Sequence, residues 1–283
     1  KSDKPIGMTS EKEEPGAWGG IQICGRAHTN AEGGKGSSEI GGAVYGGNDD
    51  ADNSGTLQYI RLEYTGFAFD EEHEANGISF YGVGNGTIVD HCQAYKGSDD
   101  GFEFFGGSVN VSNLVAVSCS DDSFDWTEGW NGKGTNLVAY QEAESTLGYD
   151  CDCLMECDNN GSNNAATPVA HPVLKNLILV GNGGSKQGIR LRAGTEVEID
   201  NAKVCGKGQP LTVETALTEN ALKNGTSKLT NITLTSELSC KEGIYTHADF
   251  IAVTSNKVDA NLSYSSFEDI KKECSWMNGS WVK

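Results

Sequence analysis

The chain repeats its own pattern after 22 residues, the offset between positions 87 and 109. Residues 87–107, TIVDHCQAYKGSDDGFEFFGG, align with residues 109–129, VNVSNLVAVSCSDDSFDWTEG. Both run from a short alternating strand through a small polar turn to Asp-Asp-Gly/Ser-Phe-acid-aromatic. Residues 184–194, GSKQGIRLRAG, keep the frame of residues 97–107 with the acids replaced. A repeat of about two dozen residues predicts a solenoid, in which each repeat stacks on the next.

A second marker of the repeat is an asparagine placed just before an apolar strand residue. It occurs at Asn113, Asn136, Asn176, Asn201 and Asn231. Equivalent positions of a parallel β-helix stack about 4.8 Å apart, so these amides could form a hydrogen-bonded ladder along the axis. The alternative is a set of independent turn residues, because Asn tolerates the left-handed backbone conformation.

These patterns predict an all-β fold, a right-handed parallel β-helix, in a single domain over residues 17–283 after a flexible lead-in at residues 1–16. Apolar residues alternate along residues 57–64, LQYIRLEY, as expected for strands. No segment has a long helical period, but residues 266–274, SFEDIKKEC, predict a short helix that could cover one open end. Residues 142–172 interrupt the repeat and predict an inserted loop pinned by disulfides.

Composition places the chain outside the reducing interior of a cell. Nine cysteines predict disulfides with one thiol left over, in a secreted, extracellular or cell-surface protein. They are Cys24, Cys92, Cys119, Cys151, Cys153, Cys157, Cys205, Cys240 and Cys274. The CxCxxxC run at residues 151–157 could instead bind a metal through thiolates, although an oxidising compartment favours disulfides.

Seven Asn-x-Ser/Thr sequons point the same way and predict a glycoprotein. They begin at Asn85, Asn110, Asn160, Asn224, Asn231, Asn261 and Asn278. The formal net charge of −19 repels phosphate backbones, which argues against a nucleic-acid partner. No stretch has the 18 or more apolar residues that suggest a membrane span, so we expect none.

Two repeats carry matching carboxylates that predict a metal site. The 22-residue offset stacks Asp99 on Asp121, Asp100 on Asp122 and Glu103 on Asp125. Like charges one strand apart repel unless they are protonated or bridged by a cation, and Ca²⁺ prefers oxygen ligands. The alternative is that one Asp of each pair caps a turn while the other faces solvent.

An enzyme could use the same acids. A calcium-dependent lyase for acidic polysaccharides needs a base, and Arg190 and Arg192 lie in the frame of Glu103 and Phe105, although intervening coils would hold them far from the metal. A glycoside hydrolase needs two carboxylates at a defined separation. The catalytic candidates are Asp99, Asp100, Asp122, Asp125, Arg190 and Arg192.

A glycan-binding module is a third interpretation. If Trp126 and Trp130 face solvent near the carboxylates, they could stack against sugar rings; the alternative is an aromatic stack inside the core. Self-association is also open, because solenoid ends that stack head to tail generate filaments.

Several stretches resemble a known group of proteins. They are PGAWGGIQICGRA, DNSGTLQYIRLEYTGF, NGISFYGVGNGT, DDGFEFFGG and DDSFDWTEGWNGKG, between residues 15 and 134. They resemble bacterial secreted and lipoprotein β-helix proteins of pectate-lyase-like architecture. The resemblance implies the fold and carries no activity with it. The cysteine-containing interruption and the sequons depart from that group. We therefore expect an extracellular structural or surface-interaction protein stabilised by calcium, as a subunit of a coat or filament, partnered by a glycan or by its own copies.

Overall fold

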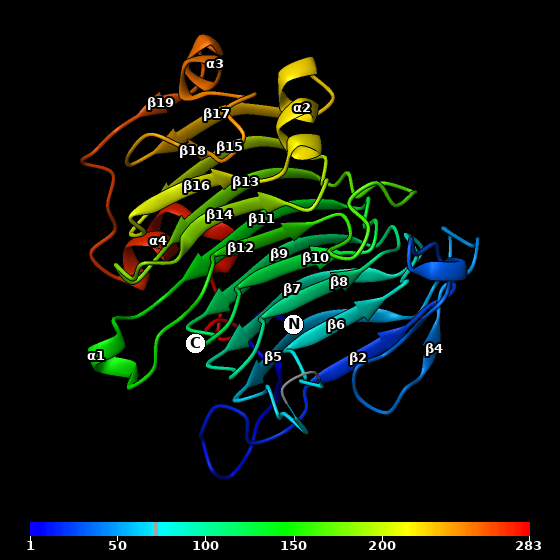
Figure 1. Cartoon of the computed structure of the whole chain (residues 1–283). Helices are drawn as coiled ribbons and strands as arrows, with labels where there is room; N and C mark the ends of the chain where they lie inside the picture. The colour runs from blue at the N-terminus through cyan, green and yellow to red at the C-terminus, as the bar shows by residue number, and fades with distance from the viewer. Residues whose placement is uncertain (71–72) are drawn as a thin grey trace.

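The computed structural model describes residues 1–70 and 73–283, most of which build two long parallel sheets (Figure 1). Sheet A contains, in spatial order, β1 (Ile6–Met8), β5 (Thr56–Glu63), β7 (Ile88–Tyr95), β9 (Asn110–Val117), β11 (Lys133–Tyr140), β13 (Val173–Val180), β15 (Glu198–Cys205), β17 (Lys228–Leu234) and β19 (Lys257–Val258). Sheet B contains β2 (Ile21–Cys24), β6 (Ile78–Tyr81), β8 (Phe102–Phe105), β10 (Phe124–Thr127), β12 (Met155–Asp158), β14 (Gln187–Arg192), β16 (Gln209–Val213) and β18 (Ser239–Cys240).

From β5 onward the chain alternates between the two sheets, and from β7 onward each strand pairs in parallel with the strand two steps earlier. This path is a right-handed parallel β-helix and confirms the predicted fold class. The remaining elements are short. They are η1 (Glu32–Gly34), β3 (Gly36–Ser37), β4 (Val44–Tyr45), α1 (Glu144–Leu147), α2 (Ala216–Asn224), α3 (His247–Ala252), α4 (Phe267–Glu273) and η2 (Ser275–Met277).

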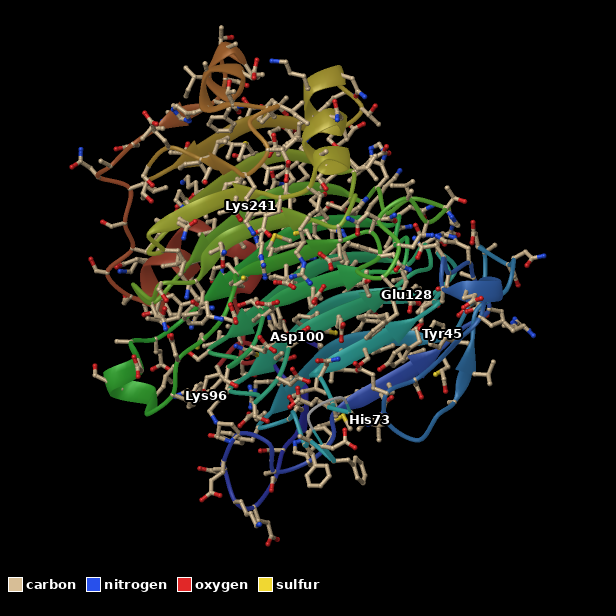
Figure 2. All side chains as sticks on the ribbon, in the orientation of Figure 1. Tyr45, His73, Lys96, Asp100, Glu128 and Lys241 are labelled. Atoms are coloured by element: carbon tan, nitrogen blue, oxygen red, sulfur yellow. The ribbon has the colours of Figure 1, made fainter. Side chains whose placement is uncertain are left out.

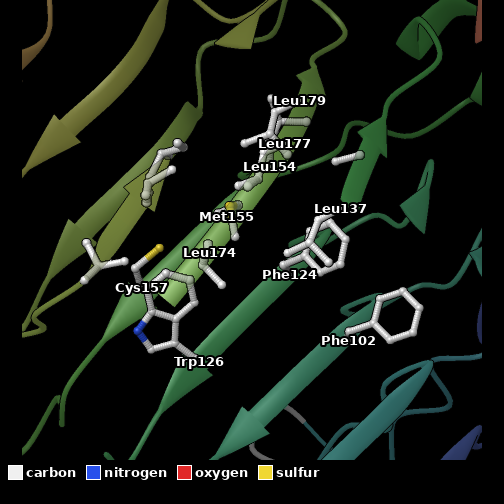
Figure 3. Packing of buried hydrophobic residues seen from close by; sticks show 14 of the residues in the cluster. Phe102, Phe124, Trp126, Leu137, Leu154, Met155, Cys157, Leu174, Leu177 and Leu179 are labelled. Carbon is white, nitrogen blue, oxygen red and sulfur yellow. The ribbon is translucent and has the colours of Figure 1, made fainter. Parts of the chain in front are cut away.

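The core lies between the sheets and is built from like residues stacked in columns. Phe102 stacks on Phe124 with ring centroids 5.5 Å apart, and Phe80 stacks on Phe104 at 5.0 Å. Figure 3 shows Phe102 and Phe124 among the leucines of the neighbouring coils. Burial of each such ring contributes about 1.5–3 kcal/mol. The aromatic column therefore fixes the register of the strands, and this register also sets the positions of the outward-facing residues that alternate with the rings.

The asparagines lie at the bends inside the strands of sheet A and form the predicted ladder over most of its length. Nδ2 of Asn136 donates to Oδ1 of Asn113 at 2.8 Å, and the same bond recurs from Asn176 at 3.0 Å and from Asn201 at 2.9 Å. Asn231 leaves the ladder and donates to Asp200 instead. All five have φ between 56° and 63°, so the tolerance of Asn for the left-handed conformation and the ladder act at the same positions.

The C-terminal helix forms, but it does not cover an end of the solenoid. In α4, Ile270 packs with Val138 and Ile178 against the outer face of sheet A, which offers an apolar surface to the apolar side of the helix. The end near β18 and β19 is instead flanked by α2 and α3 (Figure 1). There the buried carboxylate of Glu219 in α2 accepts backbone N–H groups from Ile244 and Tyr245.

Two segment predictions need correction. Residues 6–8 of the expected lead-in form β1, which pairs with β5 at the edge of sheet A. The expected loop at 142–172 contains β12, a regular strand of sheet B between β10 and β14. The repeat therefore continues through the interruption, and only the turns on either side of β12 are long.

The predicted disulfides are wrong: all nine cysteines are free thiols in the structure. Cys92 and Cys157 fill space in the solenoid core and Cys205 lies under α4, where a buried thiol packs as a small apolar side chain. Hydrogen bonds hold the interruption instead. The amide of Cys153 donates to Asp122, and Nζ of Lys207 donates to the carbonyl of Cys151.

Six of the seven sequon asparagines are exposed, and Asn160 is half-buried. None of the described helices is long and apolar enough for a membrane crossing.

Candidate functional site

The outer face of sheet B presents the carboxylates in columns along the axis. Glu103 in β8 pairs directly with Asp125 in β10, and Asp125 pairs with Glu156 in β12. In the turns that precede these strands, the backbone N–H of Asp122 donates to Oδ1 of Asp100 at 2.8 Å. The predicted stacking of the two acidic repeats is therefore confirmed in register.

These columns form one wall of a cavity of about 390 Å³. The cavity is lined by Glu39, Glu74, Asp99, Asp100, Glu103, Asp121, Asp122, Asp125, Asp152, Glu156 and Arg190. Glu39 comes from the loop between β3 and β4, and Glu74 comes from the segment that enters β6. Figure 2 shows Asp100 on the face of sheet B toward the viewer. All six predicted metal-ligating residues thus lie together in one pocket.

Few of these carboxylates have enough hydrogen-bond donors. Asp100 and Asp122 are 6% and 5% exposed, and each uses Oδ1 to accept one backbone N–H, from Asp122 and Cys153 respectively. Within the described part of the chain, Oδ2 of neither residue accepts a hydrogen bond. Oδ1 of Asp125 is buried and has no partner among the described residues. Buried carboxylate oxygens in this state are costly unless a proton or a cation satisfies them.

Burial and crowding raise the pKa of these acids. The pKa of Asp99 is raised to about 7, first by burial and then by the carboxylates of Glu74 and Asp121. The pKa of Asp121, at the more exposed mouth of the pocket, is raised to about 6 by partial desolvation and by Asp152. Burial, followed by neighbouring carboxylates, holds the pKa values of Asp100, Glu103, Asp122 and Asp125 well above their usual range.

The geometry offers overlapping groups of three ligand atoms, each group within 4.8 Å of one another. The groups are Asp99, Asp100 and Asp121; Asp100, Glu103 and Asp125; Asp122, Asp125 and Glu156; and Asp122, Asp152 and Cys153. Three of them contain only carboxylate oxygens, the ligands that Ca²⁺ prefers. Asp100, Asp122 and Asp125 each belong to two groups, so neighbouring sites share ligands.

Both candidate arginines lie on β14, two coils beyond the acidic repeats and nearer to them than expected, because in sheet B only β12 lies between β10 and β14. Arg190 lines the pocket and bonds Glu156 at 2.8 Å and Glu214 at 3.1 Å. Arg192 bonds Asp158 at 2.7 Å and Glu156 at 3.0 Å and does not itself line the cavity. Their frame with Glu103 is confirmed by the register Glu103, Asp125, Glu156, Arg190 across four strands.

Four acidic residues of the pocket were not predicted from the sequence: Glu39, Glu74, Asp152 and Glu156. A signal existed for two of them: DCLMEC at 152–157 matches DDSFDW at 121–126 in frame, with Asp152 opposite Asp121 and Glu156 opposite Asp125. Glu39 and Glu74 come from segments outside the repeat, so no offset could align them.

The predicted sugar-stacking role of Trp126 and Trp130 is wrong. Each is only 1% exposed. Nε1 of Trp126 donates to Thr195, and Trp130 stacks on Phe104 at 4.1 Å inside the core. Trp126 pairs in register with Phe104, and residues of one column face the same side of the sheet (Figure 3). The aromatic-core alternative is therefore correct.

A parallel β-helix with an uncovered acidic pocket on one sheet defines the class of this protein. The chain belongs to the family described as pectate-lyase like beta helix domain, whose model matches residues 1–283. Comparison with curated proteins found no match, and neither did comparison with solved structures.

Proposed function

We propose that this protein is an extracellular or cell-surface structural β-helix that binds calcium in its acidic pocket. The observation that carries the proposal is the lining of the cavity: ten carboxylates and one arginine among the described residues, with Arg192 and Lys186 paired to Glu156 and Asp152 from outside the lining. Ca²⁺ takes six to eight oxygen ligands, and acids of adjacent coils converge on common points. The bound cation replaces the protons that the crowded acids otherwise need and ties β8, β10 and β12 together.

The experiment is calorimetric titration of chelator-treated protein with Ca²⁺, combined with thermal melting. We expect binding and a rise in melting temperature, because a ligand that binds only the folded state stabilises it. Asp125→Asn should weaken calcium binding about tenfold, the equivalent of about 1.4 kcal/mol. Asp3→Asn, which changes an exposed acid outside the pocket, is the matched control. Absence of binding heat, or equal affinity in Asp125→Asn, would reject the proposal.

A role in surface interaction or assembly follows from the family and from the shape of the solenoid. Sheet B ends at β2, beyond which no described strand pairs. An open strand edge is a template for another strand, so stacking of copies into a coat or filament is the assembly we propose. Light scattering and electron microscopy of concentrated protein, with and without Ca²⁺, test it: a monomer under all conditions rejects assembly without affecting the calcium site.

Calcium-dependent cleavage of acidic glycans is the second candidate, favoured by Arg190 at the edge of the pocket. Two glutamates hold this guanidinium, and their charges and hydrogen bonds raise its pKa despite the opposing effect of its burial. A raised pKa makes Arg190 a poorer proton acceptor, so the geometry favours binding over catalysis. Ultraviolet absorbance of unsaturated uronate, measured over a panel of polyuronates with Ca²⁺ and then with chelator, decides: calcium-dependent product establishes the lyase, and a flat trace removes it.

A further inference from the structure

One end of the acidic pocket differs in chemistry from the rest because a buried thiol lies beside its lining residues Asp122 and Asp152. Cys153 follows Asp122 in the column that Asp100 begins, and its own backbone N–H bonds Oδ1 of Asp122 at 2.6 Å. Its side chain is wholly buried. A position that is an aspartate on two coils thus becomes a cysteine on the third, next to the same acidic wall.

The sulfur lies among oxygen atoms. Sγ of Cys153 is 3.4 Å from Oδ1 of Asp152, 3.7 Å from Oε1 of Gln187 and 4.0 Å from Oε2 of Glu156. One S–H proton can satisfy only one of these acceptors. Glu156 already bonds the guanidinium groups of Arg190 and Arg192, and Oδ2 of Asp152 already accepts from Nζ of Lys186. Oδ1 of Asp152 and Oε1 of Gln187 have no other donor among the described residues.

A second observation at this end concerns Asp122. The residue is 5% exposed; its Oδ1 accepts the N–H of Cys153, and its Oδ2 accepts no hydrogen bond from the part of the chain that the structure describes. A carboxylate oxygen of Asp122, one of Asp152 and the sulfur of Cys153 all lie within 4.8 Å of one another. The three side chains converge on one point from two different coils.

We propose that Cys153, Asp152 and Asp122, with Gln187 beside them, form a second cation site that takes a thiophilic divalent metal such as Zn²⁺. Zinc bonds of about 2.3 Å to sulfur and about 2.0 Å to oxygen, at a tetrahedral angle, place the two ligand atoms about 3.5 Å apart. The observed separation of Sγ from Asp152 is 3.4 Å. Ca²⁺ binds oxygen and not sulfur, so this end of the pocket selects a different ion from the all-carboxylate part.

Cys151 and Cys157, the other cysteines of the CxCxxxC run, belong to none of the ligand groups found among the described residues. Cys157 lies in β12 but faces the solenoid core, beside Trp126 and Met155 (Figure 3). The site is therefore one thiolate with oxygen ligands and not a cluster of thiolates. When the metal binds, the Cys153 thiol gives up its proton to solvent, and the negative charge that remains is shared with the cation.

The test is titration of reduced, metal-free protein with Cd²⁺, followed by the ultraviolet charge-transfer absorption of a cadmium–thiolate bond. We expect the absorption to saturate at one Cd²⁺ per chain, and Zn²⁺ to compete it away. Cys153→Ser should abolish the absorption and weaken Cd²⁺ binding at least about tenfold. Cys24→Ser, which removes an exposed thiol, is the matched control and should behave as wild type.

Absorption that persists in Cys153→Ser, or none in the wild type, would overturn the inference. If Cys153→Ser does not fold, Asp152→Asn decides, because this side chain is partly exposed at the pocket edge: weaker Cd²⁺ binding supports the site, and unchanged binding rejects it. The inference is independent of the proposed calcium role. If wild-type protein shows the cadmium–thiolate signal but does not bind calcium, the Cys153 site stands and the calcium role is rejected. If it binds calcium but shows no cadmium–thiolate signal, the calcium role stands and the Cys153 site is rejected.

Discussion

The bends of sheet A and the outer face of sheet B both stack like residues at the same axial spacing, but only the first stack satisfies itself. An amide both donates and accepts, so Asn136 donates to Asn113 and accepts from Asn176. An ionised carboxylate only accepts, and Asp125 stacked on Glu103 has a buried oxygen with no described partner. The same repeat that makes one ladder a stabilising element makes the other depend on protons or cations.

The two faces also differ in what covers them. The outer face of sheet A is packed against α4 and the C-terminal residues, where Ile270 and Trp281 are fully buried. The acidic face of sheet B is walled by the single side chains Glu39 and Glu74 and is otherwise open as a pocket. The chain covers the self-sufficient face and leaves the unsatisfied one accessible.

The largest expected effect comes from replacing carboxylates on the outer face of sheet B by amides like those of the asparagine ladder in sheet A. The double variant Asp100→Asn and Asp122→Asn replaces two buried carboxylates that belong to all four ligand groups between them. We expect calcium affinity to fall at least about 100-fold, on the order of 3 kcal/mol. The calcium-free protein should melt at a higher temperature, because amides no longer repel. Calorimetry and thermal melting check both, and the double variant Asp3→Asn and Glu237→Gln, at exposed acids, is the control.

The next effect is a pH dependence that only the carboxylate ladder should cause. The pKa values of Asp99 and Asp121 are about 7 and about 6 in the folded chain, and near 3.9 in the unfolded chain. At pH values between the unfolded and the folded pKa values, Asp99 and Asp121 hold more protons in the folded chain than in the unfolded chain. Their contribution to stability is therefore fully present below about pH 4 and is lost as pH rises through the folded pKa values. Calcium-free protein should lose on the order of 2 kcal/mol of unfolding free energy between about pH 5 and about pH 8.

Chemical denaturation across that range measures the slope. Saturating Ca²⁺ should remove it, because the cation takes the place of the protons. Asp99→Asn should flatten it without calcium. A stability that rises with pH in the calcium-free protein would contradict the proton-bearing ladder.

Breaking the amide ladder should have a smaller effect. Asn136→Asp keeps the size of the side chain and its tolerance for a φ of 60°, but it removes the donor to Asn113. The lost hydrogen bond and the new repulsion should cost about 1 kcal/mol, a fall of about 2–4 °C in melting temperature. Asn261→Asp, at an exposed asparagine outside the ladder, is the control. Equal melting of the two variants would show that the ladder contributes no stability.

The repeat offset was enough to predict both ladders, because a solenoid turns equal spacing in sequence into contact in space. The pairs Glu103 with Asp125 and Asn113 with Asn136 follow from it directly. The same logic, applied further, places Trp126 in the buried column of Phe104, which the sugar-stacking hypothesis overlooked.

What the offset could not predict comes from breaks in the repeat. The interruption lengthens the turns around β12, so the frame of Glu156 shifts by 31 residues from Asp125 rather than by 22. Glu39 and Glu74 reach the pocket from loops whose paths depend on tertiary contacts, such as the bond from the Tyr81 hydroxyl to Glu39. Local pattern carries no information about such long-range positions, nor about whether buried thiols pair.

The smallest expected effect comes from changing the cations that pair with carboxylates of sheet B beyond the acidic pocket. This part of sheet B lies near Lys241 (Figure 2). Arg190 neutralises Glu156 at the pocket and also holds Glu214, whereas Lys241 bonds only Glu214. Arg190→Gln should free Oε2 of Glu156 as a cation ligand, while Oε1 stays paired with Arg192, and should tighten calcium binding about threefold, less than 1 kcal/mol. Lys241→Gln removes the same charge without touching Glu156 and should leave the affinity unchanged within about 1.5-fold. If both variants tighten binding equally, the effect is long-range charge alone. If only Arg190→Gln does so, Oε2 of Glu156 is a ligand atom that Arg190 holds back, and this ion pair limits calcium binding at the edge of the pocket although Arg192 still pairs with Oε1.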